Sequence, residues 1–249
     1  MTEDKPKILV PVRVLEGEAV SQGVAEFLSS AEVLIVGYHV LPDQTAPGQA
    51  REQFEERAQK TLDELEETFE DAGADAETVL IFTHNEEKSL ERVSAENGCD
   101  ARLIGGAVAE VETVLVPLRG EVNVEAITRF VGDLLAGSDV DVTLYATAED
   151  EEEMETTRER LSSAGEVLRE SGVEKVTERT EESSSPIESV ATAAAEHDAV
   201  IMGERAPSLK TWILGEDSER VADKFHGPVV VVESVGDGEV EDTEGKKEN

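Results

Sequence analysis

A glycine-bearing loop, GERAPSLKTWILG at residues 203–215, carries the residues of this sequence that are best suited to chemistry. A loop that leads into a helix presents backbone N–H groups and the positive end of a helix dipole, and both attract phosphate. Arg119 and Arg205 would add positive charge if they converged on the same place. The pattern predicts the binding of a phosphate or another anion. The alternative is a purely structural loop, with arginines that pair with nearby carboxylates.

Other reactive residue types show no pattern that predicts catalysis or metal binding. The four histidines are scattered, and the acidic run Glu149–Glu155 lacks the alternating ligands and the glycine of a calcium loop. Cys99 has no neighbouring cation in the sequence that would activate its thiol. No nucleophile has a base at a recognisable spacing. We therefore expect no metal, no catalytic residue and no enzymatic activity.

Alternating strands and helices are the elements that must position the loop. Short apolar runs predict strands, and apolar residues at helical spacing predict helices. Strands are expected at Ile8–Val12, Val33–Tyr38, Thr78–Thr83, Ala101–Ile104, Val114–Leu118, Val140–Tyr145, Lys175–Thr180, Ala199–Met202 and Pro228–Val232, and the main helices at Ala19–Leu28, Ala50–Ala72, Glu125–Leu135, Glu151–Ser171 and Ser218–Phe225. This alternation predicts a parallel sheet covered on both faces, which binds ligands at the carboxyl ends of its strands.

Three segments of the first part of the chain recur later in the same order and at nearly the same interval. KILVPVR at residues 7–13 returns as TVLVPLR at 113–119, FEDAGADAETV at 69–79 as LRESGVEKVTE, and SLERVSAENGCDARLIGG at 89–106 as PIESVATAAAEHDAVIMGE. Three similar segments that recur in the same order indicate that the chain arose by an internal duplication. The sequence predicts an α/β fold with two tandem doubly wound parallel-sheet domains.

The two copies differ after their fourth strands. The second copy continues through the loop, a helix and a strongly apolar strand, whereas only residues 107–112 separate the end of the first copy from the next. We expect a truncated N-terminal domain at residues 1–108 and a complete domain at 111–234. Residues 235–249, a charged and glycine-bearing segment, are expected to form a disordered acidic tail.

The charge of the chain limits its partners and its environment. The 249 residues include 58 acidic and 22 basic side chains, a formal net charge of −36. Such a field repels nucleic acid and anionic lipid, so neither is an expected partner. In molar salt the Debye length is about 3 Å, which screens the self-repulsion, so dispersed acidity predicts a salt-adapted cell. The single cysteine fits a reducing interior, and without a signal peptide or a spanning segment we expect a cytoplasmic protein.

The stretch DAVIMGERAPSLKTWILGEDSERVADKFHGPVVVVE at residues 198–233 resembles the C-terminal signature of universal stress proteins, and ILVPV and VLVPL resemble that family's first strand. The resemblance implies a tandem, UspA-like protein; with the acidity, it also implies a haloarchaeal source. It further implies the family's sheet of five parallel strands, of the adenine nucleotide alpha hydrolase-like type, complete only in the second copy.

The resemblance also identifies where this chain departs from the ATP-binding members of the family. Those members have Gly-x2-Gly-x9-Gly-Ser/Thr after the fourth strand and an aspartate that closes the first. Here Ala206 replaces the middle glycine, Glu216 replaces the hydroxyl, and the first strands end in Arg13 and Arg119. We expect no cofactor, with ATP or AMP as the alternative. The residues that would form a degenerate nucleotide site are Arg119, Gly203, Arg205, Gly215 and Ser218.

The family resemblance favours a non-enzymatic regulatory or adaptor protein that acts through protein association. The last strand, Pro228–Val232, is expected at a sheet edge, where it pairs either across chains or onto the first copy. One alternative is a sensor of ATP, AMP or another anionic metabolite in the second copy. Another is a stand-alone relative of the universal stress domains attached to membrane transporters, with a transporter as partner and no segment inserted in the membrane.

Overall fold

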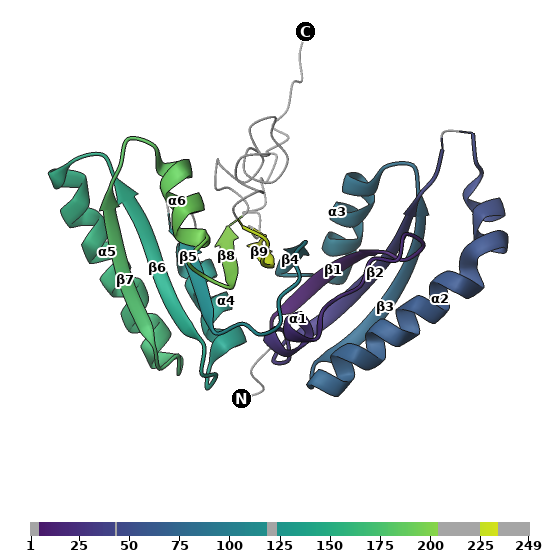
Figure 1. Ribbon diagram of the computed structural model, residues 1–249, viewed down its shortest axis with the longest axis horizontal. Helices are drawn as coiled ribbons and strands as arrows, with labels where there is room; N and C mark the ends of the chain where they lie inside the picture. Colours follow the sequence, from purple (N-terminus) through teal and green to yellow (C-terminus); the bar gives the residue numbers. More distant parts are fainter. Residues whose placement is uncertain (1–4, 43, 119–123, 204–224, 234–249) are drawn as a thin grey trace, which may run out of the picture.

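The computed structural model describes residues 5–42, 44–118, 124–203 and 225–233 (Figure 1). The strands in these residues are β1 (Lys7–Arg13), β2 (Glu32–Val40), β3 (Asp75–Thr83), β4 (Ala101–Ile104), β5 (Thr113–Pro117), β6 (Asp141–Ala148), β7 (Val176–Glu182), β8 (Ala199–Gly203) and β9 (Val229–Val232). The helices are α1 (Gln22–Phe27), α2 (Pro47–Ala72), α3 (Glu86–Asn97), α4 (Val124–Leu135), α5 (Glu151–Glu170) and α6 (Pro186–Ala194). The expected helix at Ser218–Phe225 lies almost entirely outside the described residues.

One sheet joins all of these strands in the order β3-β2-β1-β4-β9-β8-β5-β6-β7. The first half of the chain contributes β1 to β4 and the second half β5 to β8, and both halves have the same internal strand order. Each half is a doubly wound α/β unit, as the sequence predicted. In the first half, β4 leads directly to β5 without a further strand, which confirms the predicted truncation.

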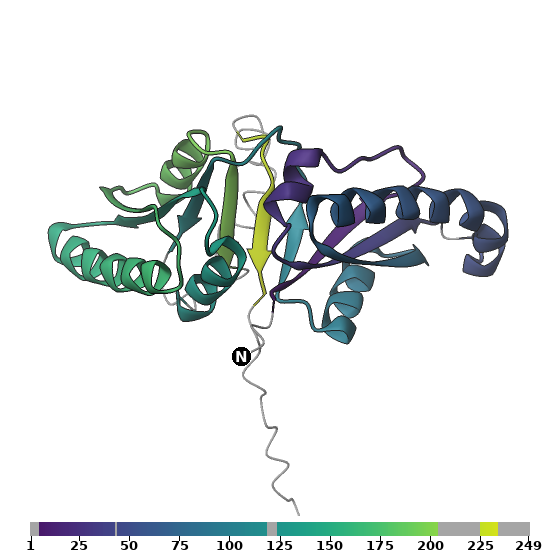
Figure 2. The same ribbon diagram turned by 90° about the horizontal axis from the view of Figure 1, so that it is seen from below.

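Strand β9 lies at the centre of the sheet, between the two halves (Figure 2). It runs parallel to β8, with Val230 beside Ile201, and antiparallel to β4, with Val230 beside Leu103. The expected position at a sheet edge is therefore wrong, whereas the expected pairing onto the first copy is confirmed. Because both sides of β9 are occupied by β4 and β8, pairing of this strand across chains is excluded in this arrangement. The run of four valines is apolar because both faces of an internal strand are buried.

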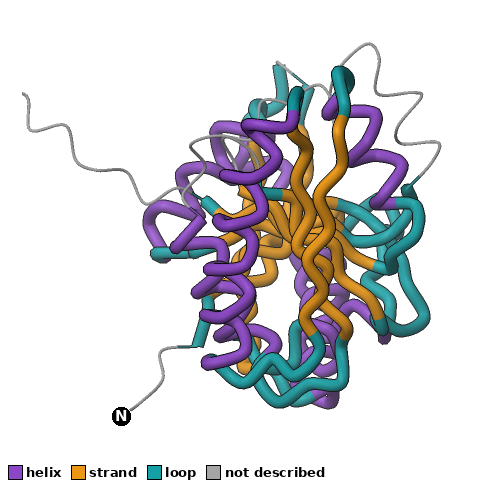
Figure 3. The backbone as a smooth tube through the Cα atoms, turned by 90° about the vertical axis from the view of Figure 1, so that its left-hand side faces the viewer, coloured by secondary structure: helices purple, strands orange, loops and turns teal. Residues whose placement is uncertain are grey.

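Helices cover both faces of the sheet (Figure 3). Apolar residues of α1, α2, α4 and α5 pack on one face in a single cluster that extends across both halves. On the other face, α3 packs in a cluster of the first half, and α6 packs in a separate cluster with β8 and β9. The core is therefore continuous on one face and divided on the other.

Local contacts define the ends of the long helices. Helix α2 ends before Gly73, which has φ 102°, as the sequence predicted. At the start of α5, the Asp150 carboxylate accepts hydrogen bonds from the N–H groups of Glu152 and Glu153. Asn85 caps α3 in the same way by accepting from the N–H of Lys88. Asp150 follows the end of β6 and Asn85 follows the end of β3, so these two caps fix the residues at the carboxyl ends of those strands.

Candidate functional site

In the first half, three side chains close the carboxyl ends of β1 and β2. Arg13 Nε donates to the Tyr38 hydroxyl at 2.9 Å, and this hydroxyl donates to Glu86 Oε1 at 2.7 Å. Arg13 Nη2 also lies 3.1 Å from Glu86 Oε2, which completes a ring of three contacts. Arg13 is the last residue of β1, Tyr38 lies in β2, and Glu86 lies in the first turn of α3. Together they form the carboxyl-end network.

Further acidic groups surround Arg13. Its backbone N–H donates to Glu18 Oε2 at 2.7 Å, and its guanidinium lies 3.6 Å from Glu16 Oε2. The hydrogen bond to Tyr38 and then the charge of Glu86 raise the already high pKa of Arg13. Arg13 therefore already has ion-pair and hydrogen-bond partners within the protein.

The second half has a related arrangement at the equivalent strand. Tyr145 on β6 donates from its hydroxyl to Glu181 Oε2 at 2.9 Å. The Arg179 guanidinium lies 5.5 Å from the centre of the Tyr145 ring and 2.7 Å from Glu196 Oε2. Each half thus places a tyrosine of its second strand against a carboxylate and an arginine, although the partners come from different elements.

The two tyrosines of the chain are expected to resist ionisation. Burial and then the carboxylate bond to each hydroxyl raise the pKa of Tyr38 and of Tyr145 to about 12, from the usual 10. Because the folded state holds these protons more tightly than the unfolded chain, their contribution to stability is complete below pH 10 and is lost as the pH rises through 12. Ultraviolet titration should show little phenolate at pH 10.5, and Tyr38→Phe should halve the final signal. Full ionisation of the folded protein near pH 10 would contradict this.

A hollow of about 440 Å³ lies beside the carboxyl-end network, and Pro11, Leu90, Leu103 and Ile104 supply apolar parts of its wall. Arg102 also lines it, from a strand position between the buried residues Ala101 and Leu103. The Arg102 side chain is partly buried and has no ion pair or hydrogen bond in the part of the chain that the structure describes. Among the described residues, the two other cationic side chains that lack such partners are those of Arg57 and Lys88, which are exposed on helices.

The Arg102 side chain, which has no ion-pair partner, determines which kind of ligand this hollow would suit. In a chain with 58 acidic residues, an arginine on an internal strand would be expected to have a carboxylate partner. Glu18, Glu86 and Glu87 also line the hollow, so its charge is not favourable for a triphosphate. A small organic anion with one acidic group and an apolar body would fit the lining, and the volume is within the range of ligand pockets.

Most of the residues predicted to form a nucleotide site cannot be placed. Gly203 is the last residue of β8, where it is buried and pairs with Val232. The other predicted members lie outside the described residues; they are Arg119, Arg205, Gly215 and Ser218. Sequence reasoning missed Tyr38, Glu86 and Arg102. The repeat gave no signal for Tyr38, because Tyr38 lies beside Arg13 of β1 whereas Tyr145 lies beside Pro117 of β5, so the two tyrosines are not at corresponding positions.

The remaining reactive side chains have structural contacts. Burial raises the pKa of the half-buried Cys99 thiol, which disfavours the reactive thiolate. His84 and His197 contact the backbone carbonyls of Leu41 and Ala193 through Nδ1, at 3.2 and 2.8 Å. Within the described ranges, no three histidine, cysteine or acidic side chains gather so as to hold a metal ion.

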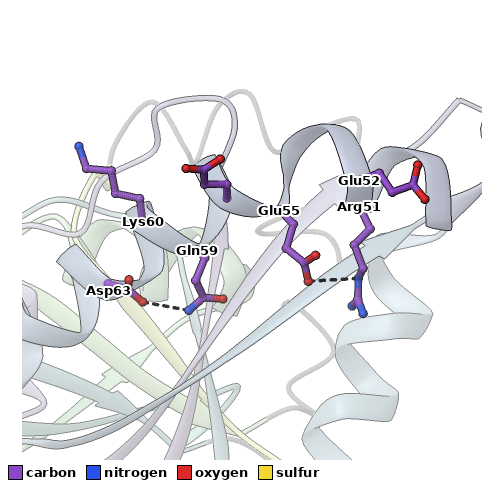
Figure 4. A pocket seen from close by; sticks show the side chains of 7 residues that line it. Arg51, Glu52, Glu55, Gln59, Lys60 and Asp63 are labelled. Carbon is purple, nitrogen blue, oxygen red and sulfur yellow. Dashed lines mark hydrogen bonds and ion pairs between the residues drawn. The ribbon is translucent and has the colours of Figure 1, made fainter.

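A second hollow, on the outer surface of α2, is formed by side chains of one helix (Figure 4). Its residues pair along the helix, with Arg51 Nε 3.6 Å from Glu55 Oε1 and Gln59 Nε2 2.9 Å from Asp63 Oδ1. These contacts are typical of a solvated helix surface, and they offer no convergent group for a ligand.

None of the described helices has the length and apolar composition that crossing a membrane requires.

Comparisons with known proteins give a family for the second half. Residues 111–233 match the universal stress protein family, and no curated protein matches the chain. A universal stress protein structure from Archaeoglobus fulgidus DSM 4304 has a TM-score of 0.66 and 17% identity, covering 94% of this chain and 98% of that one. A Pseudomonas aeruginosa UCBPP-PA14 structure assigned to the same family has a TM-score of 0.54 and 12% identity, covering 93% and 94%.

A third structure is the cytoplasmic domain of a prokaryotic cation chloride cotransporter, with a TM-score of 0.52 and 12% identity. It covers 91% of this chain and 95% of that one. At these identities the likeness shows the fold alone, and it extends over nearly the whole sheet. The chain therefore carries a universal stress protein domain at residues 111–233, and its described sheet as a whole has the universal stress protein fold.

Proposed function

We propose that this chain is a non-enzymatic regulatory protein of the universal stress type, adapted to high salt, which acts by associating with another protein. The observation that carries the proposal is the carboxyl-end network, in which Arg13 is held by Tyr38 and Glu86. A nucleotide phosphate at this place would have to displace those contacts and would meet the acidic side chains beside them.

The backbone of the first half supports the same proposal. A nucleotide site of the family's kind needs a glycine loop after the fourth strand. Here β4 ends at Ile104, and β5 begins at Thr113. The connecting segment packs on α1 instead, where the Val108 N–H donates to the Ser21 hydroxyl at 3.1 Å. In the second half, Ala206 and Glu216 stand at positions where phosphate binding favours glycine and a hydroxyl.

A transporter is one class of protein partner that this fold suits. The cotransporter cytoplasmic domain shares the arrangement of nearly the whole chain, which makes a stand-alone regulator of a transporter a specific form of the proposal. Titration of the purified chain with the isolated cytoplasmic segments of transporters from the same cell would test it. Saturable binding to one segment supports this form, and no binding to any of them removes it.

A second candidate function is the sensing of a small anionic metabolite, and the unpaired Arg102 favours it. The ligand would place its acidic group on the guanidinium and its apolar part against Leu90 and Ile104. This ligand is not a nucleotide, because the acidic lining of the hollow disfavours several negative charges. The effect of replacing Arg102 on ligand binding would therefore distinguish a sensor from an adaptor that binds no ligand.

One thermal-shift experiment in molar KCl separates these functions. ATP and AMP with Mg²⁺ at millimolar concentration are expected to leave the melting temperature of the full chain unchanged. A set of small monocarboxylates is tested on the native chain and on Arg102→Met, which keeps the apolar stem and removes the charge. A shift with a carboxylate that Arg102→Met abolishes would establish the sensor. A shift with ATP that survives in Arg102→Met would contradict the proposed lack of nucleotide binding.

A further inference from the structure

The two edge strands of the sheet, β3 and β7, lie at opposite ends of the molecule (Figure 1). Successive residues of a strand direct their N–H and C=O groups to opposite sides. In β3, the Asp75 N–H donates to the Ala31 carbonyl and the Thr83 carbonyl accepts from the Leu41 N–H, at 3.3 and 2.7 Å. Both of these groups point toward β2. The residues between them at even positions therefore direct their backbone groups outward; they are Ala76, Thr78, Leu80 and Phe82.

The same reasoning applies to β7. The Lys175 carbonyl accepts from Val142 at 2.9 Å, and the Ser183 N–H donates to Ala148 at 2.9 Å, so these groups point toward β6. The outward residues of β7 are Val176, Glu178, Thr180 and Glu182. Val10 of β1 and Val116 of β5 correspond in the repeat, and the registers that start from them make Thr78 and Glu178 equivalent positions on the two edges.

Charged side chains protect edge β7 against pairing with another strand. Arg169 Nη2 donates to the outward Val176 carbonyl at 3.0 Å and to Glu178 Oε1 at 3.0 Å. The guanidinium thus occupies the place where the N–H of an added strand would lie. Two of the four outward residues of β7 are glutamates, and charged residues on an edge also oppose strand addition.

Edge β3 has no such protection. Its outward residues are uncharged, and it contains the apolar run Val79–Phe82 within nine residues. The described residues give no hydrogen-bond partner to the outward backbone groups of Ala76, Thr78, Leu80 or Phe82. The sequence echo places Glu70 at the position of Arg169, and a carboxylate cannot donate to a carbonyl. A long, apolar and unprotected edge is a template for pairing with another strand.

We propose that β3 pairs with β3 of a second copy of this chain, in antiparallel register about Val79. In this register Ala76 of each copy pairs with Phe82 of the other, and Thr78 pairs with Leu80, so every outward backbone group finds a partner. The acidic residues Asp75 and Glu77 then lie opposite Thr83 and Ile81. No two acids of the strands face each other, whereas parallel pairing in register would place Glu77 against Glu77.

The charges around β3 also favour a second copy, provided that salt is present. Lys5 Nζ lies 2.6 Å from Asp75 Oδ2, and Lys7 Nζ lies 3.5 Å from Glu77 Oε2, so the acids of the strand have partners in their own chain. The acidic α2 helices beside the two β3 strands repel each other, and molar salt screens that repulsion. The dimer is therefore expected to strengthen as KCl rises from 0.1 to about 2 M. This inference is independent of the proposed function, because it concerns assembly and requires neither a ligand nor a partner.

Sedimentation equilibrium of the full chain in molar KCl tests the dimer. The native chain is expected to be dimeric, and Thr78→Pro to be monomeric with a dimer dissociation constant at least tenfold higher. Proline removes an outward N–H and leaves the β2 pairing intact. The matched control is Thr180→Pro, which removes an outward N–H from β7 and should leave the dimer unchanged. A native monomer at all concentrations, or a dimer that Thr78→Pro does not weaken, would overturn the proposal.

Disulfide cross-linking tests the register without relying on proline. In a Cys99→Ser background, Val79→Cys places two thiols opposite each other at a non-hydrogen-bonded pair, where Cα atoms are about 4.5 Å apart and a disulfide can form. Mild oxidation should give a covalent dimer, and Val176→Cys on the other edge should not. Circular dichroism confirms that each variant is folded. Equal cross-linking of both variants, or of neither, would contradict β3 pairing in this register.

Discussion

Val230→Asp is expected to unfold both halves of the chain together. Val230 is completely buried and lies between Leu103 of the first half and Ile201 of the second. It belongs to the apolar cluster that extends across both halves. A carboxyl group there loses the burial of valine, about 1.5–3 kcal/mol, and adds the cost of an unpaired polar group, on the order of several kcal/mol. The total is comparable to the whole stability of a domain, about 5–15 kcal/mol.

Urea unfolding followed by circular dichroism in molar KCl measures this effect. The native chain should unfold in one transition, because the shared strand couples the halves, and Val230→Asp should already be unfolded without urea. Val167→Asp is the control, since Val167 on α5 is 46% exposed and should tolerate the change to within about 0.5 kcal/mol. Loss of only one half in Val230→Asp, seen as a remaining cooperative transition, would show that β9 does not couple them.

Gly106→Ala is expected to lower the free energy of unfolding by about 2–4 kcal/mol. Gly106 has φ 87°, and a Cβ at this position would overlap the backbone of Gly227 and Pro228. Backbone atoms cannot move aside as the end of a flexible side chain can. The change therefore strains the residue itself and also separates the start of β9 from the end of β4.

Gly105→Ala is the matched control for this contact. Gly105 also has a positive φ, 51°, but a Cβ there would meet nothing within 4 Å. Gly105→Ala should lower the free energy of unfolding only by the backbone strain, about 1–2 kcal/mol. The difference between the two midpoints in urea isolates the packing of Gly106 against Gly227. Equal midpoints would mean that the close approach does not contribute to stability.

Much of the fold could be predicted because buried parallel strands are short apolar runs. Ala101–Ile104 was predicted with its observed bounds, and α2 ends at Ala72, as predicted. The edge strand β3 was predicted too short, from Thr78 instead of Asp75, because an edge admits polar residues that mask its beginning. The position of β9 was missed because strand order depends on contacts between distant segments. Its four valines nevertheless carried the pattern of an internal strand.

The candidate site was less predictable than the fold. Glu86 contacts Arg13 only because β1 and α3 meet at one end of the sheet, and no spacing in the sequence encodes that meeting. Arg102 was hidden within an apolar strand, and its lack of a partner is visible only in three dimensions. The predicted glycine loop was recognised from local pattern, but four of the five residues proposed for the nucleotide site lie outside the described part of the chain.

The central place of β9 has a consequence for the synthesis of the chain. Leu103 cannot pair with Val230 until well over a hundred further residues have been translated. At about 5–20 residues per second, the first half would spend on the order of ten seconds with the edge of β4 open. The dispersed acidic surface gives nascent copies a mutual repulsion during this interval, which opposes aggregation where salt does not fully screen it. The order of synthesis thus places the pairing of β4 with β9 after the synthesis of every other strand of the described sheet.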